Sequence, residues 1–140
     1  MPVKRIILAG AAAGVLCHIF QGTAAFLIFD RFYLANPDIV RDSTHLVGFY
    51  YLVLNLIVGV AIAYLSALLL KFLDEPDWRV GIKSGLIIWV ASSPVWIIKR
   101  QIVLNLSNWL LFEIVIDFLI YGIIGAVAGF LLGRGIIDKD

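Results

Sequence analysis

Four long apolar stretches dominate the chain, at residues 6–29, 46–70, 80–98 and 109–133. Each is close to the roughly 20 residues that a helix needs to cross the ~30 Å hydrocarbon core of a bilayer. Short segments with charged residues, proline and asparagine separate them. The pattern predicts an all-α fold, a four-helix transmembrane bundle. Because the loops leave no room for a separate soluble domain, residues 1–140 are expected to form a single membrane domain.

Composition narrows the class of protein further. Hydrophobic residues make up 62% of the chain, and the net charge of +1 provides no basic field for nucleic acid. Cys17 is the only cysteine, which excludes an intrachain disulfide and a four-cysteine metal site. The apolar run after Lys4 and Arg5 is too long for a cleaved signal peptide, so we interpret it as a retained first span.

The lysines and arginines near the span ends predict the orientation. One side of the bundle would carry Lys4, Arg5, Lys71, Arg79, Lys83, Arg134 and Lys139. The other side would carry Arg31, Arg41, Lys99 and Arg100. The richer side is expected in the cytoplasm. The chain is therefore predicted to be a multi-pass protein of the cell (cytoplasmic, or inner) membrane, with both termini in the cytoplasm.

Small residues recur at intervals of four in all four stretches. This spacing lets helix backbones approach closely in lipid, where the hydrophobic effect no longer drives helices together. The residues expected to pack helices in this way are Gly10, Gly14, Gly22, Gly59, Gly85, Gly125, Gly129 and Gly133. Matching the first and fourth spans by depth pairs Gly10 with Gly129 and Gly14 with Gly125. The starts of the first and third spans share a glycine pair, a weak sign of a parallel two-plus-two repeat.

Asp117 is the residue that most strongly indicates a site. It lies about eight residues, or about 12 Å, into the fourth stretch. An acidic side chain at that depth is costly unless it is paired, protonated or facing a wet cavity. Glu113 precedes it by one turn, and Lys99 and Arg100 are expected at the outer mouth. The other polar or aromatic residues expected around it are His18, Gln21, Asn55, Ser92, Ser93, Trp96 and Tyr121.

This group of residues has a functional and a structural interpretation. His18 beside Asp117 or Glu113 would form a titratable pair suited to proton coupling. Alternatively, the same residues form a polar network that locks the bundle, with Lys99 or Arg100 neutralising Glu113. A single divalent ion on His18, Glu113 and Asp117 is a further option, with a mixed ligand set. We predict no cofactor and no metal, because none of the familiar catalytic or metal motifs occurs.

The layout resembles small four-span prokaryotic membrane proteins of the kind classified as domains of unknown function. The resemblance rests on the run from Lys4 to Gly10 and on to Gly14, the residues Gly85, Trp89 and Pro94, and the glycine-rich stretch 109–133. It covers the whole chain and implies a small standalone four-helix bundle. It implies no activity.

We therefore expect a small membrane protein whose polar pocket opens to the outer face and binds or transports a small polar or ionic solute, with proton coupling as an option. One alternative is an accessory or structural subunit of a larger membrane complex. Another is an intramembrane enzyme acting on a lipid or quinone, which would require lateral access from the bilayer. Of these interpretations, we favour a protein that is not an enzyme. The expected partners are the lipid bilayer and either further copies of the chain or another membrane subunit, since four short spans scarcely enclose a pathway.

Overall fold

The computed structural model describes the backbone over residues 1–29, 45–104 and 109–133, and the side chains over 1–27, 48–95 and 112–133. These parts of the chain are helical throughout, apart from short turns, and contain no strand. The helices are α1 (Val3–Ala24), continued by the π-helical turn η1 (Ala25–Phe29), α3 (His45–Leu69), α4 (Asp77–Leu104) and α5 (Trp109–Gly133). The predicted all-α architecture with four helices is therefore confirmed.

Three of these helices are long and apolar enough to cross a membrane, over Val3–Leu27, Gly48–Leu69 and Phe112–Gly133. Their outward side chains are large and apolar; Phe26, for example, is 73% exposed. A surface of this kind is suited to lipid rather than water, because soluble proteins rarely expose large continuous apolar patches. The fold is that of a membrane helical bundle. Over its described residues α4 is less apolar than the other three, with Lys83 and Pro94 within it.

The α4 helix continues past the end predicted for the third stretch. It runs through Pro94 to Leu104, whereas the apolar pattern indicated an end near residue 98. No glycine or second proline follows Pro94 in this part of the chain, so nothing in the sequence stops the helix there. Just before the proline, the Ser92 hydroxyl donates a 2.7 Å hydrogen bond to the carbonyl of Ile88.

The first helix pair, α1 and α3, crosses at glycines. A Cβ atom on Gly10 would lie 2.5 Å from the Cα of Val60, and one on Gly14 would lie 2.6 Å from the carbonyl oxygen of Asn55. From the other side, a Cβ on Gly59 would meet the backbone of both Gly10 and Gly14. The two backbones are therefore in direct contact, with no room for any side chain at these positions.

The second helix pair, α4 and α5, crosses in the same way. A Cβ atom on Gly125 would collide with the carbonyl of Gly81 and lie 3.1 Å from the Cα of Gly85. A Cβ on Gly129 would lie 2.8 Å from the Cα of Gly81, and one on Gly85 would collide with the carbonyl of Tyr121. The backbones of this pair thus also touch over two turns.

These contacts correct the pairing that depth alone suggested. The predicted partners Gly10 with Gly129 and Gly14 with Gly125 are wrong, because the α1 glycines face α3 and the α5 glycines face α4. Gly22 packs against nothing: no described atom would lie within 4 Å of a Cβ placed there. Gly22 therefore does not take part in a close helix contact among the described residues.

The two helix pairs are equivalent, position by position. Similar contacts are made at the two crossings by residues at one sequence offset from α1 to α4 and at another from α3 to α5. The corresponding positions are Gly10 with Gly81, Gly14 with Gly85, Asn55 with Tyr121 and Gly59 with Gly125. Flanking buried positions also correspond: Ala9 with Val80, Ala13 with Ser84 and Ile62 with Ala128. The two helix pairs thus have similar close contacts at their crossings.

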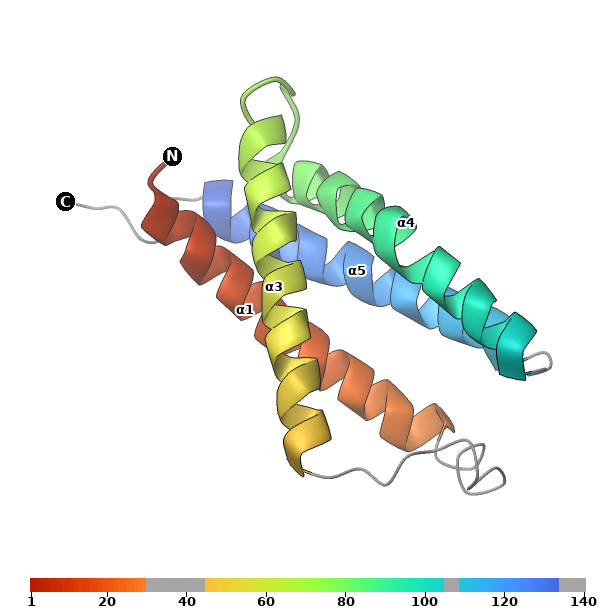
Figure 1. The fold of residues 1–140 in the computed structure, drawn as a ribbon. Coiled ribbons are helices and arrows are strands. Elements are labelled where there is room, and N and C mark those ends of the chain that lie inside the picture. The colour runs from red at the N-terminus through yellow and green to blue at the C-terminus, as the bar shows by residue number, and fades with distance from the viewer. Residues whose placement is uncertain (30–44, 105–108, 134–140) are drawn as a thin grey trace.

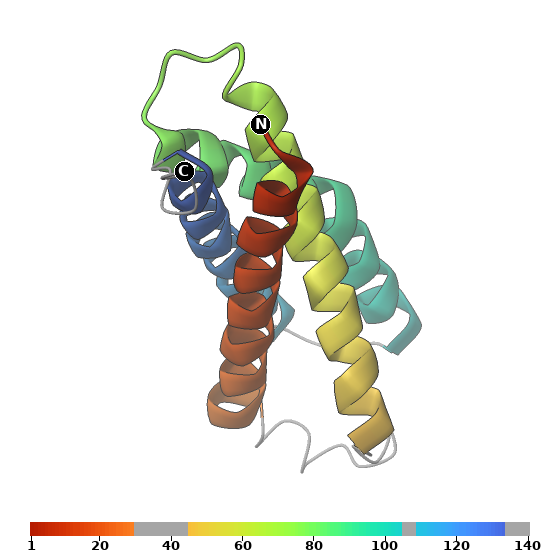
Figure 2. The same ribbon diagram turned by 90° about the vertical axis from the view of Figure 1, so that its left-hand side faces the viewer.

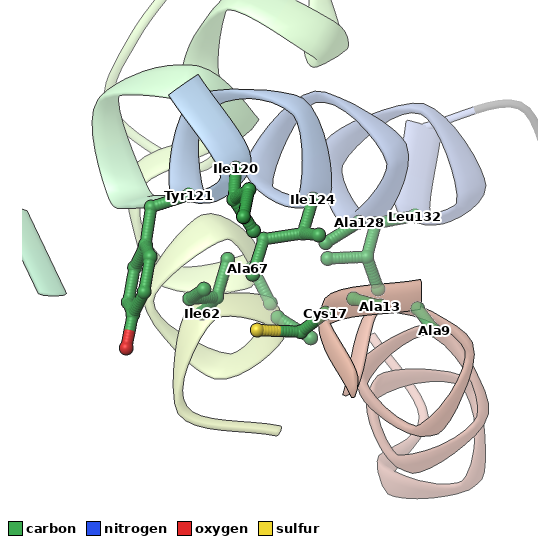
Figure 3. Close-up of a cluster of buried hydrophobic side chains, with 11 residues drawn as sticks. Ala9, Ala13, Cys17, Ile62, Ala67, Ile120, Tyr121, Ile124, Ala128 and Leu132 are labelled. Carbon is green, nitrogen blue, oxygen red and sulfur yellow. The ribbon is translucent and has the colours of Figure 1, made fainter. Parts of the chain in front are cut away.

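The two pairs meet at one end of the bundle and diverge at the other. The start of α1 and the end of α5 lie at the shared end (Figures 1 and 2). Toward the other end, α1 and α3 run apart from α4 and α5 (Figure 1). The core lies where they meet, and small α1 residues face the larger α5 side chains there (Figure 3). The core residues of these two helices are Ala9, Ala13, Cys17, Ile120, Tyr121, Ile124, Ala128 and Leu132.

Candidate functional site

The first helix pair contributes a hydrogen-bonded group of three side chains. Asn55, only 6% exposed on α3, accepts a bond from the thiol of Cys17 with Sγ and Oδ1 3.7 Å apart. Its Nδ2 lies 3.5 Å from Nδ1 of His18. The group lies one turn beyond the glycine crossing, because Asn55 precedes Gly59 by four residues. The crossing therefore fixes Asn55 against α1.

The second helix pair has a polar group at the equivalent level. The Tyr121 side chain, 5% exposed, interacts with the hydroxyls of Ser93 and Ser92 on α4. Tyr121 stands in the position that Asn55 occupies in the first pair, one turn before Gly125. On the same helix as the serines, Trp89 has a buried Nε1 without a hydrogen-bond partner among the described residues. That nitrogen is a donor left over in the interior.

Asp117 connects the two groups. It acts electrostatically on Cys17 of the first pair and on Tyr121 of the second. We call these seven residues the polar layer: Cys17, His18, Asn55, Ser92, Ser93, Asp117 and Tyr121. All four helices thus contribute side chains to the polar layer, Ser92 from an exposed position and the others from buried or half-buried ones.

The structure distributes the residues expected at the site unevenly. It brings His18 together with Asn55, and Tyr121 together with the two serines. Glu113 is half-buried one turn before Asp117, and Gln21 is half-buried on α1 outside the hydrogen-bonded group. Three expected residues have side chains outside the described part of the structure: Trp96, Lys99 and Arg100.

Cys17 is the member of the polar layer that sequence reasoning did not include. The sequence analysis used this lone cysteine only to exclude an intrachain disulfide and a four-cysteine metal site. In the structure it is fully buried and its thiol donates a hydrogen bond to Asn55. The signal was its place in the series Ala9, Ala13, Cys17, which forms the small-residue face of α1 toward α5. Among the described residues no group of three histidine, cysteine or acidic side chains is arranged to hold a metal ion. The proposed ion site on His18, Glu113 and Asp117 is therefore not supported.

A groove lies beside the polar layer, between α1 and α5. It encloses about 270 Å³ and is almost entirely apolar. The groove is open at the side. Its lining includes Phe20, Thr23, Ala24 and Leu27 of α1 and Ile116 and Ile120 of α5. The expected outward-opening polar pocket stays a prediction.

The Asn55–His18 contact can be tested as an interaction between helices. We expect Asn55→Leu and His18→Leu each to lower the free energy of unfolding in bicelles. The coupling between them in a double-mutant cycle should be about 0.6 kcal/mol, the average for interhelical polar contacts in membranes. A coupling indistinguishable from zero would show that the two side chains do not bond in the bilayer.

Comparison of the chain with protein-family models, with curated proteins and with solved structures finds no match. This agrees with a resemblance that extends only to four-span proteins of unknown function. The polar layer and the adjoining groove are therefore the features that indicate what the protein does.

Proposed function

We propose that this chain is a membrane-embedded binding or transport protein that recognises a small polar or ionic group in its polar layer. The observation that carries this proposal is the convergence of polar side chains from all four helices between the two helix pairs. A polar contact between membrane helices contributes only about 0.6 kcal/mol on average, so stability alone is a weak reason to place these groups together. Ionisable residues inside membranes usually serve a function.

The repeat supports the same proposal. Many membrane transporters are built from internal repeats, and their sites lie near the bilayer midplane where the repeats meet. Here the polar layer lies between two equivalent helix pairs that point the same way, as in transporters whose repeats are parallel. Each pair, held together at its glycine crossing, would move as a rigid unit. Rocking of one pair against the other would then change access to the polar layer.

The finer features of the membrane arrangement belong to this proposal. All four helices cross the bilayer, with α4 shielded by its close contact with α5. The glycine crossings hold each pair together in lipid. Both termini face the cytoplasm, because that side carries more lysine and arginine. The chain acts as an oligomer or with a partner membrane subunit, since four spans enclose little space.

Within the polar layer the residues have distinct roles. Asp117 carries the charge or the proton, and His18 is the second titratable group. Asn55 and Tyr121, held at equivalent places by the crossings, provide hydrogen bonds from opposite sides. The unpaired Trp89 Nε1 provides a further donor, which an acceptor on the ligand would satisfy.

Native mass spectrometry of the purified protein tests this proposal without knowledge of the ligand. We expect a reproducible bound mass on the wild-type protein. Hydrogen bonds to charged groups contribute about 1.5–3 kcal/mol, so Asp117→Asn should reduce occupancy by about tenfold or more. Asn55→Leu should reduce it as well. Tyr64→Phe, an exposed position on α3, is the control and should retain the bound mass.

The result that would overturn the proposal is a bare protein, or a bound mass that Asp117→Asn and Asn55→Leu leave unchanged. A second polypeptide that stays attached, with no small ligand, would instead identify an accessory subunit. The melting curve of each variant must show that it is still folded at the temperature of the measurement, so that loss of ligand is not loss of fold.

A further inference from the structure

One charged side chain outside the polar layer has no partner in the described part of the chain. Arg5, in the first turn of α1, is half-buried, and its Nε and Nη2 atoms are shielded from solvent without a hydrogen bond. A guanidinium stays protonated in proteins, so these atoms cannot lose their hydrogens. A buried charge that nothing compensates is strongly destabilising. Arg5 therefore requires an acceptor that the described residues do not provide.

The two unsatisfied nitrogens form one edge of the Arg5 guanidinium. Nε and Nη2 direct their N–H groups the same way, and two parallel donors of this kind fit two oxygens of a single carboxylate or phosphate. A lone carbonyl oxygen satisfies only one of them. The pair thus indicates an oxyanion as the missing acceptor.

The acidic side chains described at this end of the bundle do not supply that acceptor. Glu75 accepts a hydrogen bond from Lys83, with Oε1 and Nζ 2.6 Å apart. The Asp77 carboxylate packs against Gly133 at the end of α5, where a Cβ on that glycine would lie. Asp74 is exposed, and the first turn of α1 contains no acidic residue. Since none of these groups bonds the guanidinium, the oxyanion comes from outside the described residues.

The place of Arg5 in the bundle indicates where the oxyanion comes from. The first apolar span begins at Val3, so Arg5 lies only about 3 Å inside it, near the level of the lipid headgroups. One turn later on the same helix, Ala9 belongs to the core that α1 forms with Leu132 of α5 (Figure 3). Arg5 is thus at the shared end of the bundle, where α1 starts and α5 ends (Figure 2). Basic positions between membrane helices at this level bind lipid headgroups.

We propose that the Arg5 guanidinium binds the phosphate group of an anionic phospholipid at the shared end of the bundle. Two phosphate oxygens accept the hydrogen bonds of Nε and Nη2. Lys4, which is exposed, and the start of α1 add positive charge that favours a lipid of net negative charge. In the orientation proposed above this end faces the cytoplasm, and the cytoplasmic leaflet carries anionic lipids.

This site is separate from the polar layer and does not depend on the proposed function. Arg5 precedes Cys17 of the polar layer by twelve residues, which is about 18 Å along α1. A phosphate held by Arg5 therefore does not reach the polar layer, and the two sites can be tested independently.

Native mass spectrometry of the full chain tests the proposal. The protein is released from nanodiscs of phosphatidylglycerol and phosphatidylcholine in equal amounts and with identical acyl chains, and the ratio of the two retained lipids is measured. We expect the wild-type protein to prefer phosphatidylglycerol. Arg5→Gln should reduce this preference about tenfold, because it removes hydrogen bonds to a charged group. Arg5→Lys keeps the charge but not the paired donors, so it should retain only part of the preference.

Arg79→Gln is the matched control. It removes the same charge from the same end of the bundle, but Arg79 is exposed and its guanidinium lies 5.2 Å from the ring centre of Trp78. This variant should keep the wild-type preference. Asp117→Asn should keep it as well, because Asp117 belongs to the polar layer. Circular dichroism establishes that each variant is folded, and Arg5→Lys decides the matter if Arg5→Gln is not.

Three results would overturn the inference. If Arg79→Gln lost the preference as fully as Arg5→Gln, net charge at this end and not Arg5 would attract the lipid. If neither Arg5 variant changed the preference, the guanidinium would find its acceptor within the protein. If inorganic phosphate raised the melting temperature only when Arg5 is present, with no preference between the lipids, the site would take a soluble ion. Loss or survival of the bound mass that depends on Asp117 bears only on the proposed function.

Discussion

Gly125→Ala is expected to lower the free energy of unfolding by about 2–3 kcal/mol, the upper part of the range for overpacking a tight interior. The new methyl group would collide with the carbonyl of Gly81 and lie 3.1 Å from the Cα of Gly85. Both obstacles are backbone atoms of α4, so no side chain can rotate away to make space. The two helices would have to move apart along their whole contact.

The matched control lies three residues earlier on the same helix. No described atom would lie within 4 Å of a Cβ on Gly122, so Gly122→Ala adds a methyl group in open space. Alanine is favoured over glycine in a helix interior by about 1 kcal/mol, so this variant should be as stable as the wild type or slightly more so. Steric trapping in bicelles measures the free energy of unfolding of both variants. Equal stability of Gly125→Ala and Gly122→Ala would show that α4 and α5 do not touch here.

Much of the architecture could be predicted because lipid imposes a simple rule on length and composition. An apolar run long enough to span the bilayer must form a helix, since every backbone polar group has to be satisfied within the segment. The stretch 109–133 coincides with α5, and the stretch 46–70 differs from α3 by one residue at each end. Depth along each run also placed Asp117, His18 and Asn55 at similar levels.

The choice of partner helices could not be predicted in this way. Small residues four apart occur on all four helices, and this spacing does not specify which helix each of them meets. Depth favoured a contact between α1 and α5 glycines, but every pair of antiparallel helices offers matching depths. The rotation of each helix decides the partner, and it depends on the whole packed surface. Gly22 shows the same limit, since its spacing is regular and its surroundings are empty.

The groove was also beyond sequence reasoning, for a related reason. It depends on how α1 and α5 pack, and an apolar residue such as Phe20 gives the same sequence pattern whether it faces a neighbouring helix, a groove or lipid. The divergence of the two helix pairs produces both features at once. Where the pairs meet, small α1 residues such as Ala9 and Ala13 pack against the larger side chains of α5. Where they part, polar side chains face one another and an opening to the bilayer lies beside them.

The equivalence of the two pairs leads to the second large effect that we expect. Gly14→Ala and Gly85→Ala should each destabilise the protein by about 2–3 kcal/mol, as overpacking requires. The methyl group on residue 14 would lie 2.6 Å from the carbonyl oxygen of Asn55, and that on residue 85 would collide with the carbonyl of Tyr121. Because the two crossings share no partner, the double variant should show the sum of the losses within about 0.5 kcal/mol.

These two substitutions differ from ordinary packing defects in what they displace. Each pushes on the backbone of a polar-layer residue, Asn55 or Tyr121, so each should also reduce the bound mass seen by native mass spectrometry. Gly22→Ala on α1 is the control for both readouts, because the space around it is open. If only one of the two substitutions lowered the free energy of unfolding, the two helix pairs would not be equivalent. If both lost stability while the bound mass stayed at wild-type occupancy, the crossings would hold the bundle without holding the site. Loss of both together is expected, because the carbonyls that the glycines contact belong to the residues that face the ligand.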